Sequence, residues 1–155
     1  WGALCAKRIF MQIESADSAS WNIAEGFRDD KPILIRYRPD LDSLFGHLNY
    51  SERLVIFWDY VCTNSAGLPD NNQLNDMREF EDSIVEALDK DRLGIFVYSY
   101  TYSGTREWHF YVSNIQLVGE TINNALASFP KLPIELQVED DPQWDKLKSI
   151  YAHCK

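Results

Sequence analysis

The sequence lacks any apolar run long enough to cross a membrane. No stretch approaches the roughly 18 consecutive apolar residues that a membrane-spanning helix requires, so we expect no membrane span. Internal repeats, low-complexity tracts and long linkers rich in glycine or serine are also missing. We therefore expect a single domain over residues 1–155.

Cysteine is scarce, and its positions are unsuited to metal binding. Cys5, Cys62 and Cys154 lie far apart and form no Cys-x-x-Cys pair or Cys-His cluster, which argues against structural zinc. The acidic run at residues 139–141 follows a strand pattern, so its carboxylates splay to different sides and make a poor metal cage. We expect no metal and no cofactor. Dispersed free thiols are typical of a reducing compartment, so we expect a cytoplasmic location.

Positive charge is in deficit: 15 Lys and Arg residues face 24 Asp and Glu residues, which gives a net charge of −9. A surface this negative repels phosphate backbones and anionic membranes, so we expect no nucleic-acid or membrane partner. The same charge suits docking onto a basic protein surface. Hydrophobic residues make up 45% of the 155 residues, enough for a buried core.

The amino-terminal part predicts two strands. The chain begins with Trp rather than Met, and its first residues are too few to identify a signal peptide. Residues 1–13 could form a short helix or strand. Residues 20–24 and 33–38 have strand patterns, and the polar residues 29–32 predict a turn between them.

From Leu54 onward the pattern predicts strand, helix, strand, strand, helix, strand. The expected elements are a buried strand over 54–60, a helix with apolar positions from 74 to 88, strands over 95–102 and 106–112, a helix from 118 to 129 and a strand over 134–139. A turn at Ser103-Gly104 joins the central strands, and Asp141-Pro142 is typical of the start of a terminal helix.

This order is that of the ferredoxin-like βαββαβ plan. We therefore expect an α+β fold in which a mainly antiparallel sheet carries helices on one face. The amino-terminal strands and the carboxy-terminal helix would extend this core.

Short motifs along the chain carry a family resemblance through their order and spacing. They are Gly67-Leu68-Pro69, Glu81-Asp82, Gly104-Thr105-Arg106-Glu107 leading into Phe110-Tyr111-Val112, and Asp141-Pro142-Gln143-Trp144, with Trp21-Asn22-Ile23-Ala24 and the strand over 32–38 at the amino end. Over about residues 20–151 the sequence resembles the bacterial family called domain of unknown function 695. The resemblance implies no catalytic residues. Some family members carry a segment similar to a bacterial regulator that inhibits ribonuclease E, which implies a regulatory role through protein contacts.

Aromatic and polar side chains gather on one predicted sheet face. Alternation puts four aromatic residues on one side of a central strand: Phe96, Tyr98, Tyr100 and Tyr102. We expect Glu107, His109 and Tyr111 of the next strand on the same face, with Glu135 and Gln137 nearby, while helices cover the Trp108 side. Such a face could stack RNA bases, but the RNA-recognition signature is missing and the negative charge disfavours it.

His109 is a candidate general base because Glu107 lies two residues before it on the same side of the strand. No serine or cysteine nucleophile accompanies it in a recognisable turn. A lone histidine in a strand is more often packed and hydrogen-bonded. We therefore favour a structural role and expect no catalytic residue.

Three arginines lie in or beside strands of this acidic chain: Arg36, Arg38 and Arg106. They could clamp a carboxylate or a phosphate. They could equally form ion pairs that tie a helix to the sheet, which we prefer because a buried arginine needs a carboxylate. The candidate acceptors are Asp59, Glu81 and Asp82.

The sequence favours a non-enzymatic binding or regulatory domain that acts through protein contacts. Its surface would be the free sheet face or the acidic helix faces, and an exposed sheet edge would permit a homodimer. The alternative is a small-molecule-binding domain or enzyme with a cleft on the sheet face. That cleft would use Arg36, Arg38, Tyr98, His109 and Tyr111, with Tyr100 and Arg106 as further ligand-binding candidates.

Overall fold

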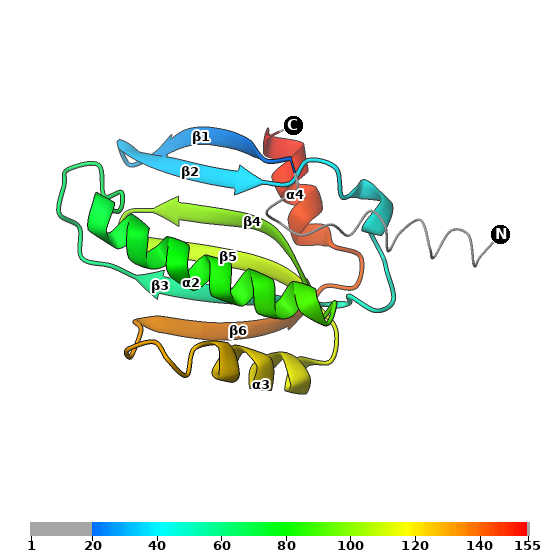
Figure 1. Cartoon of the computed structure of the whole chain (residues 1–155). Coiled ribbons are helices and arrows are strands. Elements are labelled where there is room, and N and C mark those ends of the chain that lie inside the picture. Colours follow the sequence, from blue (N-terminus) through cyan, green and yellow to red (C-terminus); the bar gives the residue numbers. More distant parts are fainter. Residues whose placement is uncertain (1–19, 155) are drawn as a thin grey trace.

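The computed structural model describes residues 20–154, and the elements within this range form one sheet with helices on both faces (Figure 1). The strands are β1 (Asn22–Arg28), β2 (Lys31–Tyr37), β3 (Glu52–Asp59), β4 (Gly94–Tyr102), β5 (Thr105–Val112) and β6 (Ile134–Asp140). The helices are α2 (Asn71–Lys90), α3 (Ile115–Ala125) and α4 (Asp145–Cys154), with a short 3₁₀ turn η1 (Asp42–Leu44). Residues 1–13, for which we expected a short helix or strand, and Cys5 lie outside the described residues.

The six strands pair in the order β1-β2-β4-β5-β3-β6, and every neighbouring pair is antiparallel. The predicted α+β class with a mainly antiparallel sheet is therefore confirmed. The β1–β2 hairpin extends the sheet beside β4, as the amino-terminal strand patterns predicted. Its turn is only Asp29-Asp30, both with positive φ, because a two-residue loop of this kind matches the twist of the strands.

Two apolar clusters lie on opposite faces of the sheet. Helices α2 and α3 cover one face, where Ile56, Phe80 and Trp108 are almost fully buried. Helix α4 and η1 cover part of the other face (Figure 1). In the apolar cluster on that side, Tyr111 and Trp144 are almost fully buried. The two core helices α2 and α3 thus share one face, as expected, whereas the apolar stripe of the carboxy-terminal helix α4 packs on the opposite face. Within residues 20–154 no helix is long and apolar enough to cross a membrane.

A β-bulge in β4 changes which face its side chains reach. The pairing with β5 runs from Phe96 opposite Phe110 to Tyr98 opposite His109, so one extra residue lies between them. Phe96 consequently packs in the α2 cluster and Tyr98 in the α4 cluster. The prediction that both share one face was wrong because a bulge breaks the two-residue alternation.

Helix α4 begins later than predicted. Asp141 does cap the amino end of α4, because its carboxylate accepts hydrogen bonds from the backbone N–H groups of Asp145 and Lys146. Pro142, however, lies in a turn before the helix, and Trp144 follows with a φ of 62°. Left-handed backbone at Trp144 prevents a continuous helix from Pro142.

Candidate functional site

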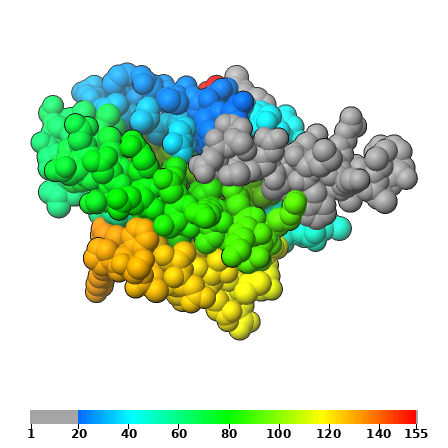
Figure 2. All heavy atoms as spheres, viewed as in Figure 1, coloured from blue at the N-terminus to red at the C-terminus, as the bar shows by residue number. Residues whose placement is uncertain are grey.

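A narrow groove of about 200 Å³ lies between helix α2 and strands β1, β2, β4 and β5. The β1–β2 hairpin (blue) and α2 (green) border each other on this side of the molecule in Figure 2. Its polar lining consists of Arg36, Arg78, Glu81, Ser99, Thr101 and Arg106, and Ile23, Leu34, Leu74 and Met77 form its apolar walls. We call it the arginine groove.

Glu81 is the one carboxylate among the described residues that line the arginine groove, and it already has two partners. Its Oε2 accepts a hydrogen bond from Arg36 Nη2 at 2.8 Å, and its Oε1 accepts one from Trp108 Nε1 at 2.9 Å. The preferred ion pair between an arginine and Glu81 is therefore confirmed. This pair ties α2 to the sheet, as we expected.

Unlike Arg36, Arg106 forms no ion pair among residues 20–154. Within residues 20–154 its guanidinium forms one hydrogen bond, from Nε to Thr101 Oγ1 at 2.9 Å, and stands 5.9 Å above the Trp108 ring centre. Burial lowers the pKa of Arg106; Glu81 raises it and Arg36 lowers it further. Both terminal nitrogens of Arg106 are thus available to an acceptor.

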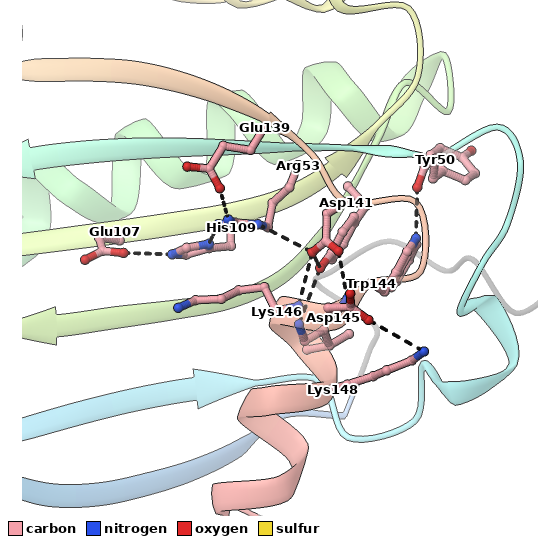
Figure 3. A network of polar contacts seen from close by, with 12 residues as sticks. Tyr50, Arg53, Glu107, His109, Glu139, Asp141, Trp144, Asp145, Lys146 and Lys148 are labelled. Atoms are coloured by element: carbon pink, nitrogen blue, oxygen red, sulfur yellow. Dashed lines mark hydrogen bonds and ion pairs between the residues drawn. The ribbon is translucent and has the colours of Figure 1, made fainter.

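On the opposite face a buried polar network has Arg53 at its centre (Figure 3). Arg53 Nη1 lies 3.0 Å from His109 Nδ1, and Arg53 Nη2 donates to Glu139 Oε2. Arg53 Nε lies 3.7 Å from Asp141 Oδ2. One guanidinium therefore links β3, β5, β6 and the start of α4.

His109 is neutral in this network. Burial lowers its pKa to about 4, although the hydrogen bond to Glu107 acts in the opposite direction and the charge of Arg53 adds to the lowering. Since Arg53 can only donate, Nδ1 must accept, and Nε2–H then donates to Glu107 Oε1 at 2.8 Å. This tautomer makes His109 a packed, hydrogen-bonded residue, with only 2% of its surface exposed.

Tyr98 stacks on His109 with ring centres 4.0 Å apart. Within residues 20–154 nothing accepts or donates a hydrogen bond at its buried hydroxyl. Burial raises the pKa of Tyr98 far above its ordinary value. The phenol therefore stays protonated and contributes a packing surface.

Asp141 connects the network to α4. Tyr111 Oη donates to Asp141 Oδ2 at 2.7 Å, and the Tyr111 ring stacks on Trp144 with centres 4.0 Å apart. Burial, followed by the bond to Asp141, raises the pKa of Tyr111. Trp144 Nε1 in turn donates to the Tyr50 carbonyl at 2.8 Å. The same residues therefore dock α4 and close this part of the sheet face.

The part of this face that α4 leaves open carries a shallow hollow of about 400 Å³, which we call the sheet hollow. Its lining residues are Arg28, Phe57, Asp59, Tyr100, Tyr102, Ser103, Thr105, Glu107, Glu135 and Gln137. Arg28 donates to the Tyr100 hydroxyl at 2.9 Å and lies over the Tyr102 ring. Glu107 belongs to both the sheet hollow and the His109 network, so it joins the surface to the buried site.

A larger, more apolar hollow of about 550 Å³ lies between the start of α2 and the segment joining α3 to β6. Aromatic side chains, two prolines and Val61 form it, and carboxylates surround it. Its lining residues are Trp58, Asp59, Tyr60, Val61, Gln73, Asp76, Glu79, Phe129, Pro130, Lys131, Leu132 and Pro133. We call it the aromatic hollow.

The structure divides the residues of the predicted cleft into separate groups. Arg36 and Arg106 meet in the arginine groove, on the α2 side of the sheet. The aromatic group lies on the other side: Tyr98, His109 and Tyr111 in or against the network and Tyr100 in the sheet hollow. Arg38 lies beyond β2, buried beside α4, where its carbonyl accepts from the Tyr151 hydroxyl. The sheet separates the two groups, so they do not line one cleft.

Sequence reasoning missed Arg53 and the aromatic hollow. Arg53 directly precedes the apolar run of β3. The sequence analysis did not single it out, because its position beside His109 follows only from the register of β3 against β5. The sequence pattern places Trp58 and Tyr60 in a buried strand and Phe129 in a helix, and only their positions around the start of α2 show that they line a hollow. Within residues 20–154 no group of three or more histidine, cysteine or carboxylate residues is placed to hold a metal ion.

The six-stranded antiparallel sheet with helices on both faces places the chain among α+β domains. A family model described as "Family of unknown function (DUF695)" matches residues 19–150, so the chain belongs to that family. Searches of curated proteins and of solved structures gave no match.

Proposed function

We propose that this domain binds a protein partner and that the aromatic hollow receives a basic segment of that partner. The observation that carries the proposal is an aromatic, proline-lined hollow of about 550 Å³ bordered by carboxylates. Its volume lies within the range of about 300–1,000 Å³ that ligand sites occupy. Binding rather than turnover is the activity that we assign to it.

The charges around the aromatic hollow favour a cationic occupant. Within the described part of the chain, Asp59, Asp76 and Glu79 oppose the single lining cation Lys131, so these residues carry a net charge of −2 (three negative, one positive). Aromatic faces attract ammonium and guanidinium groups as well. A second copy of this strongly acidic chain would bring like charges together, which disfavours self-association at this surface.

The aromatic hollow has an accessible apolar contact. Val61 is 78% exposed, and Asp59 belongs both to this hollow and to the sheet hollow. The two hollows therefore meet at the end of β3. A basic segment with one large apolar side chain could bury that side chain at Val61 and place its cations near the carboxylates.

A random peptide library selected against the purified domain tests this chemistry directly. We expect enrichment of peptides that combine lysine or arginine with an aromatic or large aliphatic residue. The double variant Asp76→Lys/Glu79→Lys should bind these peptides at least about tenfold more weakly, since it reverses two charges at the rim. Binding should also weaken as salt is added.

The matched control is Glu25→Lys/Glu120→Lys, which makes the same change in total charge at exposed positions outside the hollow. It should bind the selected peptides almost as tightly as the parent domain. If both double variants lost peptide affinity equally, binding would depend only on the net charge of the protein. That result, or enrichment of acidic peptides, would contradict the proposal.

We also infer that the central elements have the ferredoxin-like topology. The order β3, α2, β4, β5, α3, β6 and the sheet order β4-β5-β3-β6 support this inference. A cytoplasmic location stays part of the proposal and is supported by the free thiols Cys62 and Cys154. A homodimer through an exposed sheet edge stays a prediction.

A further inference from the structure

We propose that the arginine groove binds the phosphoryl group of a small phosphorylated ligand. The groove flanks α2 on the side facing β2 and β4, whereas the aromatic hollow lies on the side facing the α3–β6 segment. The inference is independent of protein binding at the aromatic hollow, because the two linings share no residue.

The charge balance of the groove is the first observation. Among residues 20–154, Arg36, Arg78 and Arg106 face the single lining carboxylate of Glu81, so these described residues have a net charge of +2 (three positive, one negative). The groove is therefore positive although the whole chain has a net charge of −9. Partly buried cations are destabilising unless a negative charge lies beside them. A phosphoryl group carries about −1.5 to −2 charges at neutral pH and matches the excess, whereas a carboxylate supplies one.

Available hydrogen-bond donors are the second observation. Among the described residues nothing accepts a hydrogen bond from the buried Nε of Arg36, and the terminal nitrogens of Arg106 have no acceptor. The Thr101 hydroxyl accepts from Arg106 Nε, so its own proton remains available. Thr101 is 1% exposed and Ser99 is 7% exposed, both at the floor of the groove. Guanidinium and hydroxyl donors together suit the three oxygens of a phosphoryl group.

The size and walls of the groove limit the ligand. A volume of about 200 Å³ holds a phosphoryl group and a few further atoms, and it is smaller than sites for drug-sized ligands. Ile23, 66% exposed, and the aliphatic side chain Leu74 border the groove. The phosphoryl group would lie against Arg106, and the remainder of the ligand would extend past these aliphatic side chains toward solvent.

Titration with inorganic phosphate at constant ionic strength, followed by amide and arginine Nε signals in NMR spectra, tests the site. We expect saturable shifts at Thr101 and Arg106, and no saturable shift with acetate at the same concentrations. Arg106→Gln should weaken phosphate binding about tenfold to a hundredfold, which is the range expected for loss of a charge-assisted contact. Arg78→Gln, an exposed change that leaves the core intact, should weaken it severalfold.

Arg28→Gln is the matched control, since it removes one positive charge on the opposite face, in the sheet hollow. It should leave phosphate affinity within about twofold of the parent. Because Arg78 is exposed, its variant keeps the test valid even when Arg106→Gln fails to fold. Absence of saturable shifts, equal weakening by Arg28→Gln, or acetate binding as tight as phosphate binding would each overturn the proposal.

Discussion

Arg53 joins four elements through one guanidinium, and its charge adds to the lowering of the His109 pKa that burial causes. It lies within contact of His109, Glu139 and Asp141, and only about 9% of its side chain is exposed. A buried cation without partners would be strongly destabilising. The network therefore fixes how β5, β6 and α4 are arranged around β3, while burial keeps His109 neutral.

The neutral His109 predicts a loss of stability in weak acid. Its pKa is about 4 in the folded protein, whereas an unfolded histidine titrates near 6.5. Below about pH 6.5 the unfolded chain binds a proton that the folded protein does not, so the free energy of unfolding falls until about pH 4. We expect His109 alone to cost about 2 kcal/mol between pH 7 and pH 5, measured by urea denaturation.

The control for this pH effect is His109→Gln, whose amide can still face Arg53 and Glu107. The variant lacks the titrating ring, so its stability should fall less steeply over the same interval. The difference between the two proteins isolates His109 from other groups, including Lys146 of α4, whose charge also lowers the His109 pKa. Parallel pH profiles for the two proteins would show that His109 does not titrate as described.

Sequence reasoning predicted some of these residue-level features and missed others. An ion pair between a strand arginine and one of three nearby carboxylates was expected because a buried arginine needs a carboxylate, and Arg36–Glu81 is such a pair. The contact between Arg53 and His109 was not expected, because it depends on the register of β3 against β5. Strand patterns fix which way side chains point but leave open which residues of a distant strand lie opposite them.

At the scale of elements, α4 is held to the sheet by a few residues near its amino end. Trp144 is fully buried, stacks on Tyr111 and donates to the carbonyl of Tyr50. Asp141 binds the first backbone N–H groups of the helix. These contacts hold α4 over part of the sheet face and leave the sheet hollow open.

Trp144→Ala should detach α4 and lower the free energy of unfolding by about 3–5 kcal/mol, because it removes a large buried ring. Trp144→Phe should cost less, since it keeps a ring against Tyr111 and loses the hydrogen bond to Tyr50. Hydrogen exchange distinguishes local from global loss: α4 amides should exchange faster in Trp144→Ala while α2 amides stay protected. Unchanged protection of α4 would show that other contacts hold it.

The elements themselves were largely predictable, whereas local irregularities were not. Apolar spacing identified both long helices and the central strands, because these segments bury one stripe or one face. The bulge between Phe96 and Tyr98 adds one residue without any change in composition, so alternation put Phe96 on the wrong face. Pro142 suggested an earlier start for α4, but the left-handed backbone at Trp144 delays it.

Across the whole molecule, sites of opposite charge lie on either side of α2. The arginine groove carries an excess of +2 and the aromatic hollow an excess of −2. Composition predicted an acidic protein suited to a basic partner, yet it could not show that three arginines gather in one groove. That separation depends on tertiary structure, because the groove combines residues from β1, β2, β4, β5 and α2.

The most direct measurement maps a short lysine–tryptophan peptide onto the domain by NMR, with a glutamate–tryptophan peptide of equal length as control. The basic peptide should shift the backbone amides of Val61, Gln73 and Leu132, and the shifts should diminish as salt is added. The acidic peptide should leave these amides unchanged. Equal shifts with both peptides, or shifts confined to surfaces away from the aromatic hollow, would contradict the proposed binding function.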